Sequence, residues 1–173
     1  NLEAPEIIYN PDLKEYYLFV SYDPLMTTYN VRVGRSDKAE GPFIDYFGKE
    51  LKDTTNNFPI LTAPYRFKNH PGWAGTAHCA VFTSDDGQYF MAHQGRLSPQ
   101  NQMMDLHVRQ VFFTKDGWPV VSPERYAGSN PREFSAADLV GEWEIIRVQE
   151  PLYERKLEAG QILWGEGELQ DEE

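Results

Sequence analysis

The stretch of residues 2–22, LEAPEIIYNPDLKEYYLFVSY, decides the fold of this chain. It contains two runs rich in β-branched and aromatic residues, 6–10 (EIIYN) and 16–22 (YYLFVSY), and such residues favour strands. The intervening PDLKE carries Pro and Asp, which suit a reversal of the chain. The stretch therefore predicts an antiparallel strand pair, and a third strand is expected at 29–36 (YNVRVGRS).

The same pattern returns in the second half of the chain. Before it, GPFIDYFG (41–48) is expected as a short fourth strand or an extended edge, and the Pro- and Gly-containing stretch 49–76 predicts a long loop. Four further strands are expected at 78–84, 88–96, 104–114 and 118–123. Two successive sets of about four antiparallel strands predict an all-β fold with repeated sheets. Periodicity alone favours a β-propeller and a β-sandwich equally.

Composition narrows the class of protein. The 173 residues suffice for one medium domain or parts of two. The formal net charge of −11 would repel a phosphate backbone, so the sequence argues against nucleic acid as a partner. Cys79 is the only cysteine, which rules out an internal disulfide and a CxxC metal site. No stretch of the sequence is long and apolar enough to predict a membrane span.

The C-terminal part of the chain differs in composition. Residues 127–138 are small and polar with one Pro, which predicts a linker, and strands are expected at 139–149 (LVGEWEIIRVQ) and 160–167 (GQILWGEG). Two strands do not make a stable domain. Because the chain does not begin with Met, either it was processed or it is a piece of something longer. The expected units are a β domain at 1–128, a linker at 129–138 and an incomplete β domain at 139–173.

Two side chains are candidates for chemistry. Glu3 lies between Leu2 and Ala4 at the start of a strand, where partial burial would favour the protonated carboxyl that a general acid requires. The alternative is a surface glutamate at a frayed terminus. His78 follows the small residues GTA at the start of a strand, and is either a metal ligand or a hydrogen-bonded structural histidine.

Three further residues, Tyr22, Asn30 and Trp73, are candidates for binding a hydroxylated ligand. Tyr22 and Asn30 flank the loop DPLMTT at strand ends, and they suit sugar recognition and ordinary packing equally. Trp73 lies in the long loop and suits stacking on a sugar face. His93 and Arg96 lie at or near the end of one strand, where an arginine either holds a carboxylate or extends along the sheet edge.

Several stretches, in order, resemble glycoside hydrolase family 43, and above all its endo-1,5-α-L-arabinanases. They are LEAPEIIYNPDLKEYYLFVSY, YNVRVGRSDKAEGPF, HCAVFTSDDGQYFMAHQGR and LHVRQVFFTKDGWPVVSPERYAG, and they cover about residues 1–128. The resemblance implies a five-bladed β-propeller of which this chain supplies about two blades, the fourth and the fifth. It also implies hydrolysis of α-1,5-linked arabinan with inversion of configuration. LVGEWEIIRV resembles the start of a small C-terminal β-barrel domain of larger arabinanases.

The family's general acid is a Glu in an E-[GA]-P motif, and Glu3 in EAP matches it. The general base and an orienting carboxylate are aspartates of earlier blades, and no Asp of this chain matches their motifs. The chain alone is therefore expected to be inactive without the missing N-terminal blades. A family histidine that binds calcium together with water matches His78, although TAHC departs from the usual G-H-N stretch.

The resemblance also bears on the ligand. The SYDPLMTTYN region resembles the family's substrate-lining segment, and His93 and Arg96 match positions near the active centre. The implied substrate is arabinan of the plant cell wall, so the enzyme is expected to be secreted or periplasmic. One alternative is a family 43 xylosidase or arabinofuranosidase. The other is a non-catalytic carbohydrate-binding β module that stacks sugars on Trp73 and Tyr22.

Overall fold

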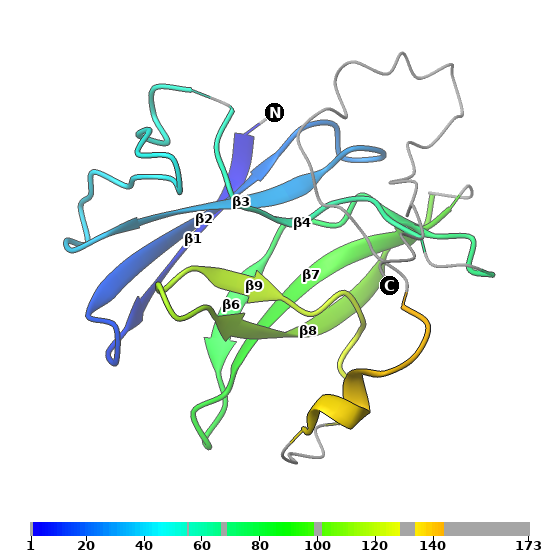
Figure 1. Cartoon of the computed structure of the whole chain (residues 1–173). Helices are drawn as coiled ribbons and strands as arrows, with labels where there is room; N and C mark the ends of the chain where they lie inside the picture. The colour runs from blue at the N-terminus through cyan, green and yellow to red at the C-terminus, as the bar shows by residue number, and fades with distance from the viewer. Residues whose placement is uncertain (1, 55, 67–68, 99–101, 129–133, 144–173) are drawn as a thin grey trace.

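The computed structural model describes residues 2–54, 56–66, 69–98, 102–128 and 134–143. Its first sheet consists of four antiparallel strands in chain order (Figure 1). These are β1 (Leu2–Asn10), β2 (Glu15–Tyr22), β3 (Asn30–Ser36) and β4 (Ile60–Thr62). The strands predicted at 6–10, 16–22 and 29–36 are confirmed, and β1 begins earlier than expected. The Asn10 side chain accepts hydrogen bonds from the backbone N–H of Asp12 and Leu13, which closes the β1–β2 turn.

The second sheet repeats this arrangement. It contains β6 (Ala80–Thr83), β7 (Tyr89–Leu97), β8 (Asp105–Phe113) and β9 (Pro119–Val121), and the two-residue β5 (Trp73–Ala74) pairs with the far end of β7. Gly87 and Gly117 lie in the turns DDG and KDG with φ of 84° and 83°, a conformation that glycine adopts without strain. The four strands predicted for the second half of the chain are therefore confirmed.

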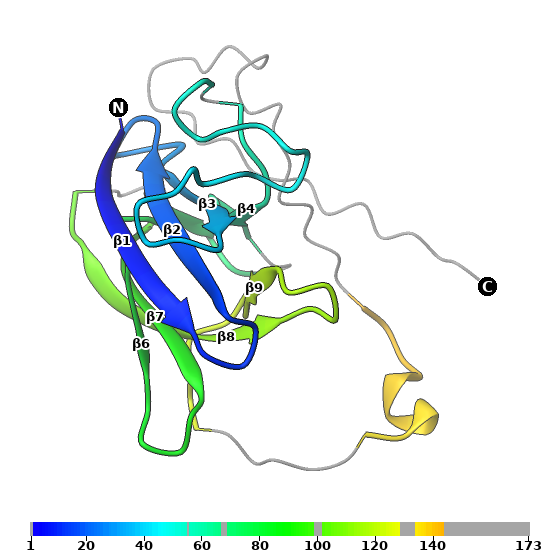
Figure 2. The same ribbon diagram turned by 90° about the vertical axis from the view of Figure 1, so that its left-hand side faces the viewer.

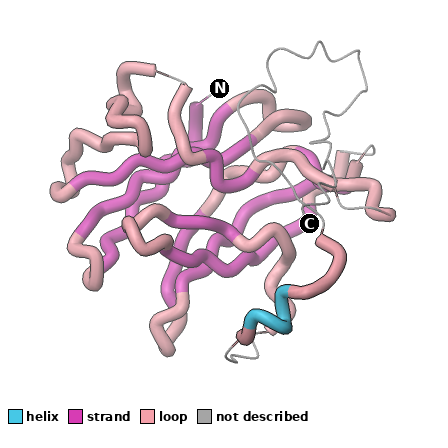
Figure 3. The backbone as a smooth tube through the Cα atoms, viewed as in Figure 1, coloured by secondary structure: helices cyan, strands magenta, loops and turns pink. Residues whose placement is uncertain are grey.

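The order of the strands separates the two candidate architectures. In each sheet, hydrogen-bonded neighbours follow one another along the chain apart from the short β5, whereas immunoglobulin-like sandwiches use Greek-key connections between sheets. The two sheets pack against each other, with β1 in contact with β6 and β4 in contact with β9 (Figure 2). Loops connect the strand ends (Figure 3). Consecutive meander sheets packed in this way are typical of neighbouring propeller blades.

The core lies between the two sheets. Along β2, the fully buried Tyr17 and Phe19 alternate with the half-buried Leu18 and Val20, as expected for a strand with one face on a core. The Tyr17 hydroxyl donates a hydrogen bond of 2.6 Å to the carbonyl of Gly117, in the turn between β8 and β9. This bond ties the first sheet to the second. The buried cluster comprises Tyr17, Phe19, Tyr29, Val31, Val33, Leu61, Ala77, Cys79, Val81, Met91, Val111 and Trp118.

The prediction of a strand or extended edge at 41–48 is wrong for most of that stretch. Within it, only Ile44 forms isolated bridges to neighbouring backbone. The Asp45 carboxylate accepts hydrogen bonds from the backbone N–H of Phe47 and Lys49, over 2.9 and 2.8 Å. An aspartate that binds the backbone ahead of it stabilises a turn, so the chain leaves the sheet edge here.

The prediction of a loop throughout 49–76 is wrong in two places. Strand β4, the fourth strand of the first sheet, lies in this stretch, and so does β5. All three residues of β4 are buried, and it directly follows Pro59. A buried strand this short has no alternation between polar and apolar residues, which explains why the sequence pattern does not reveal it.

The structure describes only part of the expected linker and C-terminal β domain. A short 3-10 helix, Ala136–Leu139, lies mostly within the expected linker, and the backbone of residues 140–143 forms no strand. Residues 144–173, most of the expected C-terminal β domain, lie outside the described residues, so the domain boundaries stay a prediction. In the part of the chain that the structure describes, no helix has the length and apolar character needed to cross a membrane.

Candidate functional site

Glu3 lies on β1 beside an irregularity of the strand. The pairing of β1 with β2 changes register between Glu3 and Glu6. Ala4, within this interval, has φ of 50°, which is uncommon for a residue with a Cβ. A bulge of this kind redirects neighbouring side chains. Glu3 pairs with Ser21 of β2 and is half-buried, so its carboxyl lies at the boundary between protein and solvent.

The Glu3 carboxylate is held by a buried tyrosine. The Tyr29 hydroxyl donates a hydrogen bond of 2.6 Å to Glu3 Oε1, and the Tyr29 residue is 0% exposed. Burial is the main cause that raises the pKa of Tyr29, and the hydrogen bond to Glu3 acts in the same direction. The phenol therefore keeps its hydrogen and serves as a donor to the carboxylate.

His78 joins the same group from the chain that leads into β6. Its backbone is left-handed, with φ of 59°, and its N–H donates to the Ser21 hydroxyl over 2.9 Å. The residue is exposed, and its ring Nδ1 lies 3.4 Å from the Tyr29 hydroxyl. The structure thus brings together Glu3 and His78, the two residues that the sequence singled out for chemistry, at one tyrosine hydroxyl.

Tyr22 and Asn30 lie in a buried polar network around Arg32. Asn30 Nδ2 donates to Asp23 Oδ2 over 2.5 Å, and Asn30 Oδ1 accepts from Arg32 Nε over 3.0 Å. The Arg32 guanidinium lies 4.9 Å from the centroid of the Tyr22 ring. Tyr22 and Asn30 are 2% and 0% exposed, so both side chains contact protein in this structure. Their role in substrate binding stays a prediction.

Asp23 is the acidic member of this network. Its Oδ2 lies 3.7 Å from a terminal nitrogen of the buried Arg32. Burial raises the pKa of the Asp23 carboxyl, while Asn30 and Arg32 act in the opposite direction. The network fixes the loop between β2 and β3. Tyr29 lies at the end of that loop, so the loop determines where the donor to Glu3 is placed.

Two candidates of the second sheet, Trp73 and His93, contact the buried His107. The Trp73 and His107 rings meet edge to face with centroids 4.4 Å apart, and His93 pairs with His107 across β7 and β8 with ring centroids 5.1 Å apart. Arg96 donates to the carbonyl of Gln102 over 3.3 Å. Trp73, His93 and Arg96 are all buried. Contact of these three residues with a substrate also stays a prediction.

The two buried histidines are neutral at physiological pH. Burial first, and the Arg109 guanidinium second, lower the pKa of His93 to about 3 and that of His107 to about 4. Arg109 lies 3.2 Å from His107 Nδ1, and because a guanidinium only donates, Nδ1 is the acceptor. His107 Nε2 packs so closely on Gly95 that a Cβ at that position would collide with it.

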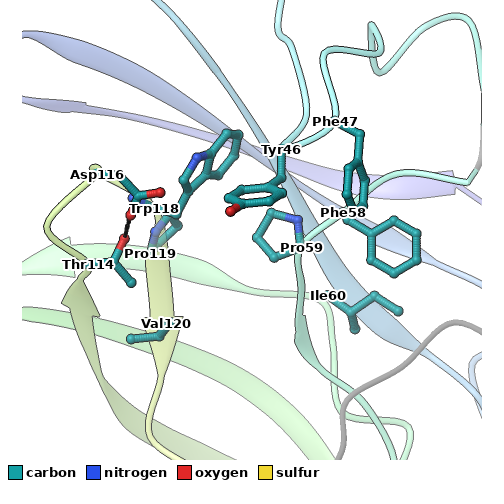
Figure 4. Close-up of a pocket in the computed structure, with 10 residues that line it drawn as sticks. All are labelled: Tyr46, Phe47, Phe58, Pro59, Ile60, Thr114, Asp116, Trp118, Pro119 and Val120. Carbon is teal, nitrogen blue, oxygen red and sulfur yellow. Dashed lines mark hydrogen bonds between the residues drawn. The ribbon is translucent and has the colours of Figure 1, made fainter.

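A separate cavity of about 340 Å³ opens where the loop before β4 meets the turn before β9 (Figure 4). Tyr46 and Trp118 pack there edge to face with centroids 5.5 Å apart. Tyr46 and Phe47 are both largely exposed. The residues proposed for sugar stacking, Trp73 and Tyr22, are not among its lining. The lining comprises Tyr46, Phe47, Phe58, Pro59, Ile60, Thr114, Asp116, Trp118, Pro119 and Val120.

Sequence reasoning missed Tyr29 and Ser21 as partners of the site. Tyr29 belongs to no motif in the sequence, and its contact with Glu3 spans 26 positions of the chain. Strand register contains the missing signal. Antiparallel pairing of β1, β2 and β3 places Ser21 between Glu3 and Val31. Val31 lies two residues after Tyr29, so the register brings Tyr29 toward Glu3.

Comparison with known proteins identifies the family of this chain. The model of Glycosyl hydrolases family 43 matches residues 1–119. The chain belongs to this family. An extracellular endo-alpha-(1->5)-L-arabinanase 2 from Bacillus subtilis is 31% identical over 166 residues, which cover 84% of this family 43 chain and 35% of that relative. The chain thus spans about a third of the length of the relatives it matches.

Solved structures of family 43 enzymes share the fold. A family 43 glycoside hydrolase from Bacillus licheniformis matches with a TM-score of 0.78 and 28% identity, over 85% of this chain and 37% of its own. An endo-1,5-alpha-L-arabinanase from Thermotoga petrophila matches with a TM-score of 0.77 and 28% identity, over 83% of this chain and 36% of its own. The two sheets are therefore part of a family 43 β-propeller, and the resemblance seen in the sequence is confirmed.

Proposed function

We propose that this family 43 chain carries the general acid of an inverting hydrolase of α-1,5-linked arabinan, and that Glu3 is this acid. The observation that carries the proposal is the placement of a half-buried carboxyl, bonded by Tyr29 over 2.6 Å, at the start of β1 in the EAP motif. The relatives from Bacillus subtilis and Thermotoga petrophila are both named endo-arabinanases, which supports the choice of substrate.

In the proposed reaction, Glu3 gives its proton to the glycosidic oxygen while the bond from that oxygen to the anomeric carbon breaks. The leaving sugar departs as a neutral alcohol, and water attacks from the opposite face. A base must accept a proton from this water, with the two carboxyl groups about 6.5–9.5 Å apart in inverting glycosidases. We propose that the base and the orienting aspartate come from N-terminal blades outside this chain, so that the chain alone is inactive.

The remaining candidates would shape the sugar-binding cleft. Tyr22, Asn30, Trp73, His93 and Arg96 are held by protein contacts, so we propose that they form rigid walls and supports. A rigid wall is the arrangement that positions a sugar ring for attack.

Calcium is proposed as a cofactor, with His78 as its protein ligand and water as the other ligands. The donor set fits in one respect, because Tyr29 contacts Nδ1 of the exposed ring and leaves Nε2 for coordination. Among the described residues, no group of three or more histidine, cysteine or acidic side chains could hold a metal. Calcium prefers oxygen ligands, and water is proposed to supply them here. A bound calcium would supply positive charge beside the site.

The names of the relatives also inform location and specificity. Three of them are called extracellular, so we propose that the enzyme acts outside the cytoplasm, secreted or periplasmic, on cell-wall arabinan. One of the three, from Cellvibrio japonicus, is named an exo-alpha-(1->5)-L-arabinofuranosidase and is 28% identical over 124 residues. This relative favours exo-acting cleavage of the same linkage as the second candidate function.

The test is Glu3→Gln in the full-length gene product, assayed on linear 1,5-α-arabinan. We expect turnover to fall about 10²–10⁴-fold while arabinan binding is retained, because only proton donation is lost. The matched control is Glu6→Gln, three residues along β1, where the carboxylate accepts a long 3.4 Å bond from the backbone N–H of Val81. The control should keep near-normal turnover.

Three outcomes would overturn parts of the proposal. Undiminished turnover in Glu3→Gln would show that another group is the acid. A wild-type protein that binds arabinan without cleaving it would favour the carbohydrate-binding module. Cleavage of xylan in preference to arabinan would place the protein among family 43 enzymes of other specificity.

A further inference from the structure

We propose that the buried Tyr29 hydroxyl is a positioning group of the general acid, because it occupies Glu3 Oε1 and leaves Oε2 as the oxygen that delivers the proton. This inference rests on the proposed function of Glu3. It concerns a residue for which neither the EAP motif nor the family match provides a role.

Tyr29 is held firmly enough to act in this way. It is 0% exposed and belongs to the core cluster between the sheets. Its backbone N–H donates to the carbonyl of Pro24 over 3.1 Å, which closes the loop just before β3. The ring therefore has little freedom, and its hydroxyl presents a fixed donor to a carboxyl on the neighbouring part of β1.

The count of hydrogens gives the direction of each contact. A phenol has one hydrogen, and the 2.6 Å distance assigns it to Glu3 Oε1. The contact with His78 Nδ1 at 3.4 Å must then run from the imidazole to the phenol oxygen. No group of the described residues bonds to Glu3 Oε2. When Glu3 is protonated, the proton thus resides on Oε2.

The contact strengthens as the reaction proceeds. As the proton leaves Oε2 for the glycosidic oxygen, the carboxyl becomes a carboxylate, and a hydrogen bond to an ionised acceptor is shorter and stronger than one to a neutral acceptor. Tyr29 keeps its hydrogen in this bond, because the phenol has one hydrogen and directs it to Glu3 Oε1 over 2.6 Å. An interaction that is stronger in the transition state than in the ground state raises the rate.

The experiment compares two substrates of the full-length gene product, aryl α-1,5-arabinobiosides with a good leaving group (2,4-dinitrophenol) and a poor one (phenol). The good leaving group needs no proton. We expect Tyr29→Phe to lower kcat/KM about 10- to 100-fold on the poor substrate, the usual range for a hydrogen bond to a charged group, and less than about threefold on the activated one. Glu3→Gln should show the same selectivity to a larger extent.

Tyr17→Phe is the matched control. Tyr17 is also 0% exposed and its hydroxyl also donates over 2.6 Å, but to the carbonyl of Gly117. The control should lose stability with little change in the ratio of kcat/KM between the two substrates. If Tyr29→Phe does not fold, 3,5-difluorotyrosine at position 29 keeps the shape and alters only the donor, and it should change that ratio.

If Tyr29→Phe lowers kcat/KM equally on both substrates, the residue only supports the fold, and the inference is overturned. An unchanged rate on both, or an unchanged ratio with difluorotyrosine, would overturn it as well. These results leave the role of Glu3 intact as long as Glu3→Gln is selective. A Glu3→Gln variant without selectivity would instead overturn the proposed function.

Discussion

Acidification should destabilise this protein through the buried pair His93 and His107. Both are neutral in the folded state, with pKa values lowered to about 3 and about 4 from the ordinary 6.5. At pH values between the folded and the unfolded pKa of these histidines, the unfolded chain binds more protons than the folded chain. The free energy of unfolding therefore falls as the pH falls below the unfolded pKa of 6.5. The contribution is fully present above that value.

At pH values well above the folded pKa of each histidine, the size of this loss of stability depends only on protonation of the unfolded chain. Between about pH 7.5 and about pH 5.5, protonation of one unfolded histidine removes between about 1 and 2 kcal/mol from the free energy of unfolding. The pair together removes about 2–3 kcal/mol. Below about pH 4, protonation of the folded His107 would end its share of the loss.

Urea unfolding of the full-length gene product at both pH values is the assay. His93→Gln and His107→Gln each change stability at neutral pH through lost packing, so the quantity to compare is the difference between the two pH values. Each variant should lose between about 1 and 2 kcal/mol less on acidification than the wild type. Met91→Leu, a fully buried change on β7 that removes no titratable group, is the control and should match the wild type in this difference.

A pH difference that is the same in both histidine variants and the wild type would refute the reasoning. It would mean that the imidazoles bind protons in the folded state as they do in the unfolded chain, and therefore that the second sheet does not bury them.

Two further predictions concern a buried ion pair and the single thiol. Asp23→Ala should lower the free energy of unfolding by about 3–5 kcal/mol because it leaves the buried Arg32 charge without its carboxylate, whereas Glu15→Ala, which breaks the more exposed 3.9 Å pair with Arg35, should cost less than about 1 kcal/mol by urea denaturation. Equal effects would contradict the assigned burial. Burial raises the pKa of the Cys79 thiol to about 12, so labelling by a thiol reagent should be at least about 100-fold slower in the folded protein than in urea; comparable rates would mean that Cys79 is accessible.

The sequence predicts the long strands well, because their patterns are strong. β2, β3 and β8 are rich in β-branched and aromatic residues, and the chain turns at Asp, Pro or Gly residues after each of them. The short β4 has no pattern of its own and is placed by pairing with β3, so only the three-dimensional structure reveals it. At 41–48 the Asp45 turn overrides the extended tendency of the aromatic residues around it.

In the candidate site, too, residues in local motifs can be predicted from the sequence, whereas residues placed by long-range contacts cannot. The EAP motif and a strand-start histidine point to Glu3 and His78 from local sequence. Tyr29 cannot be found in this way, because its hydroxyl reaches Glu3 only through the register of three strands and a loop fixed by Asp23 and Arg32. Burial of Trp73 was likewise unpredictable, since it depends on the packing of its ring against a histidine of another strand.

The origin of the contacts around Glu3 has a consequence for how such enzymes can be recombined. The carboxyl and the Ser21 hydroxyl belong to one sheet, and the Tyr29 donor lies in the loop directly before the third strand of that sheet. The approach to the next sheet contributes a backbone N–H and the His78 ring. A backbone N–H is offered by any residue except proline. In the proposed enzyme, a chimera that exchanges this blade whole would therefore carry the Glu3 carboxyl together with its Tyr29 donor, while the His78 ring would come with the next blade.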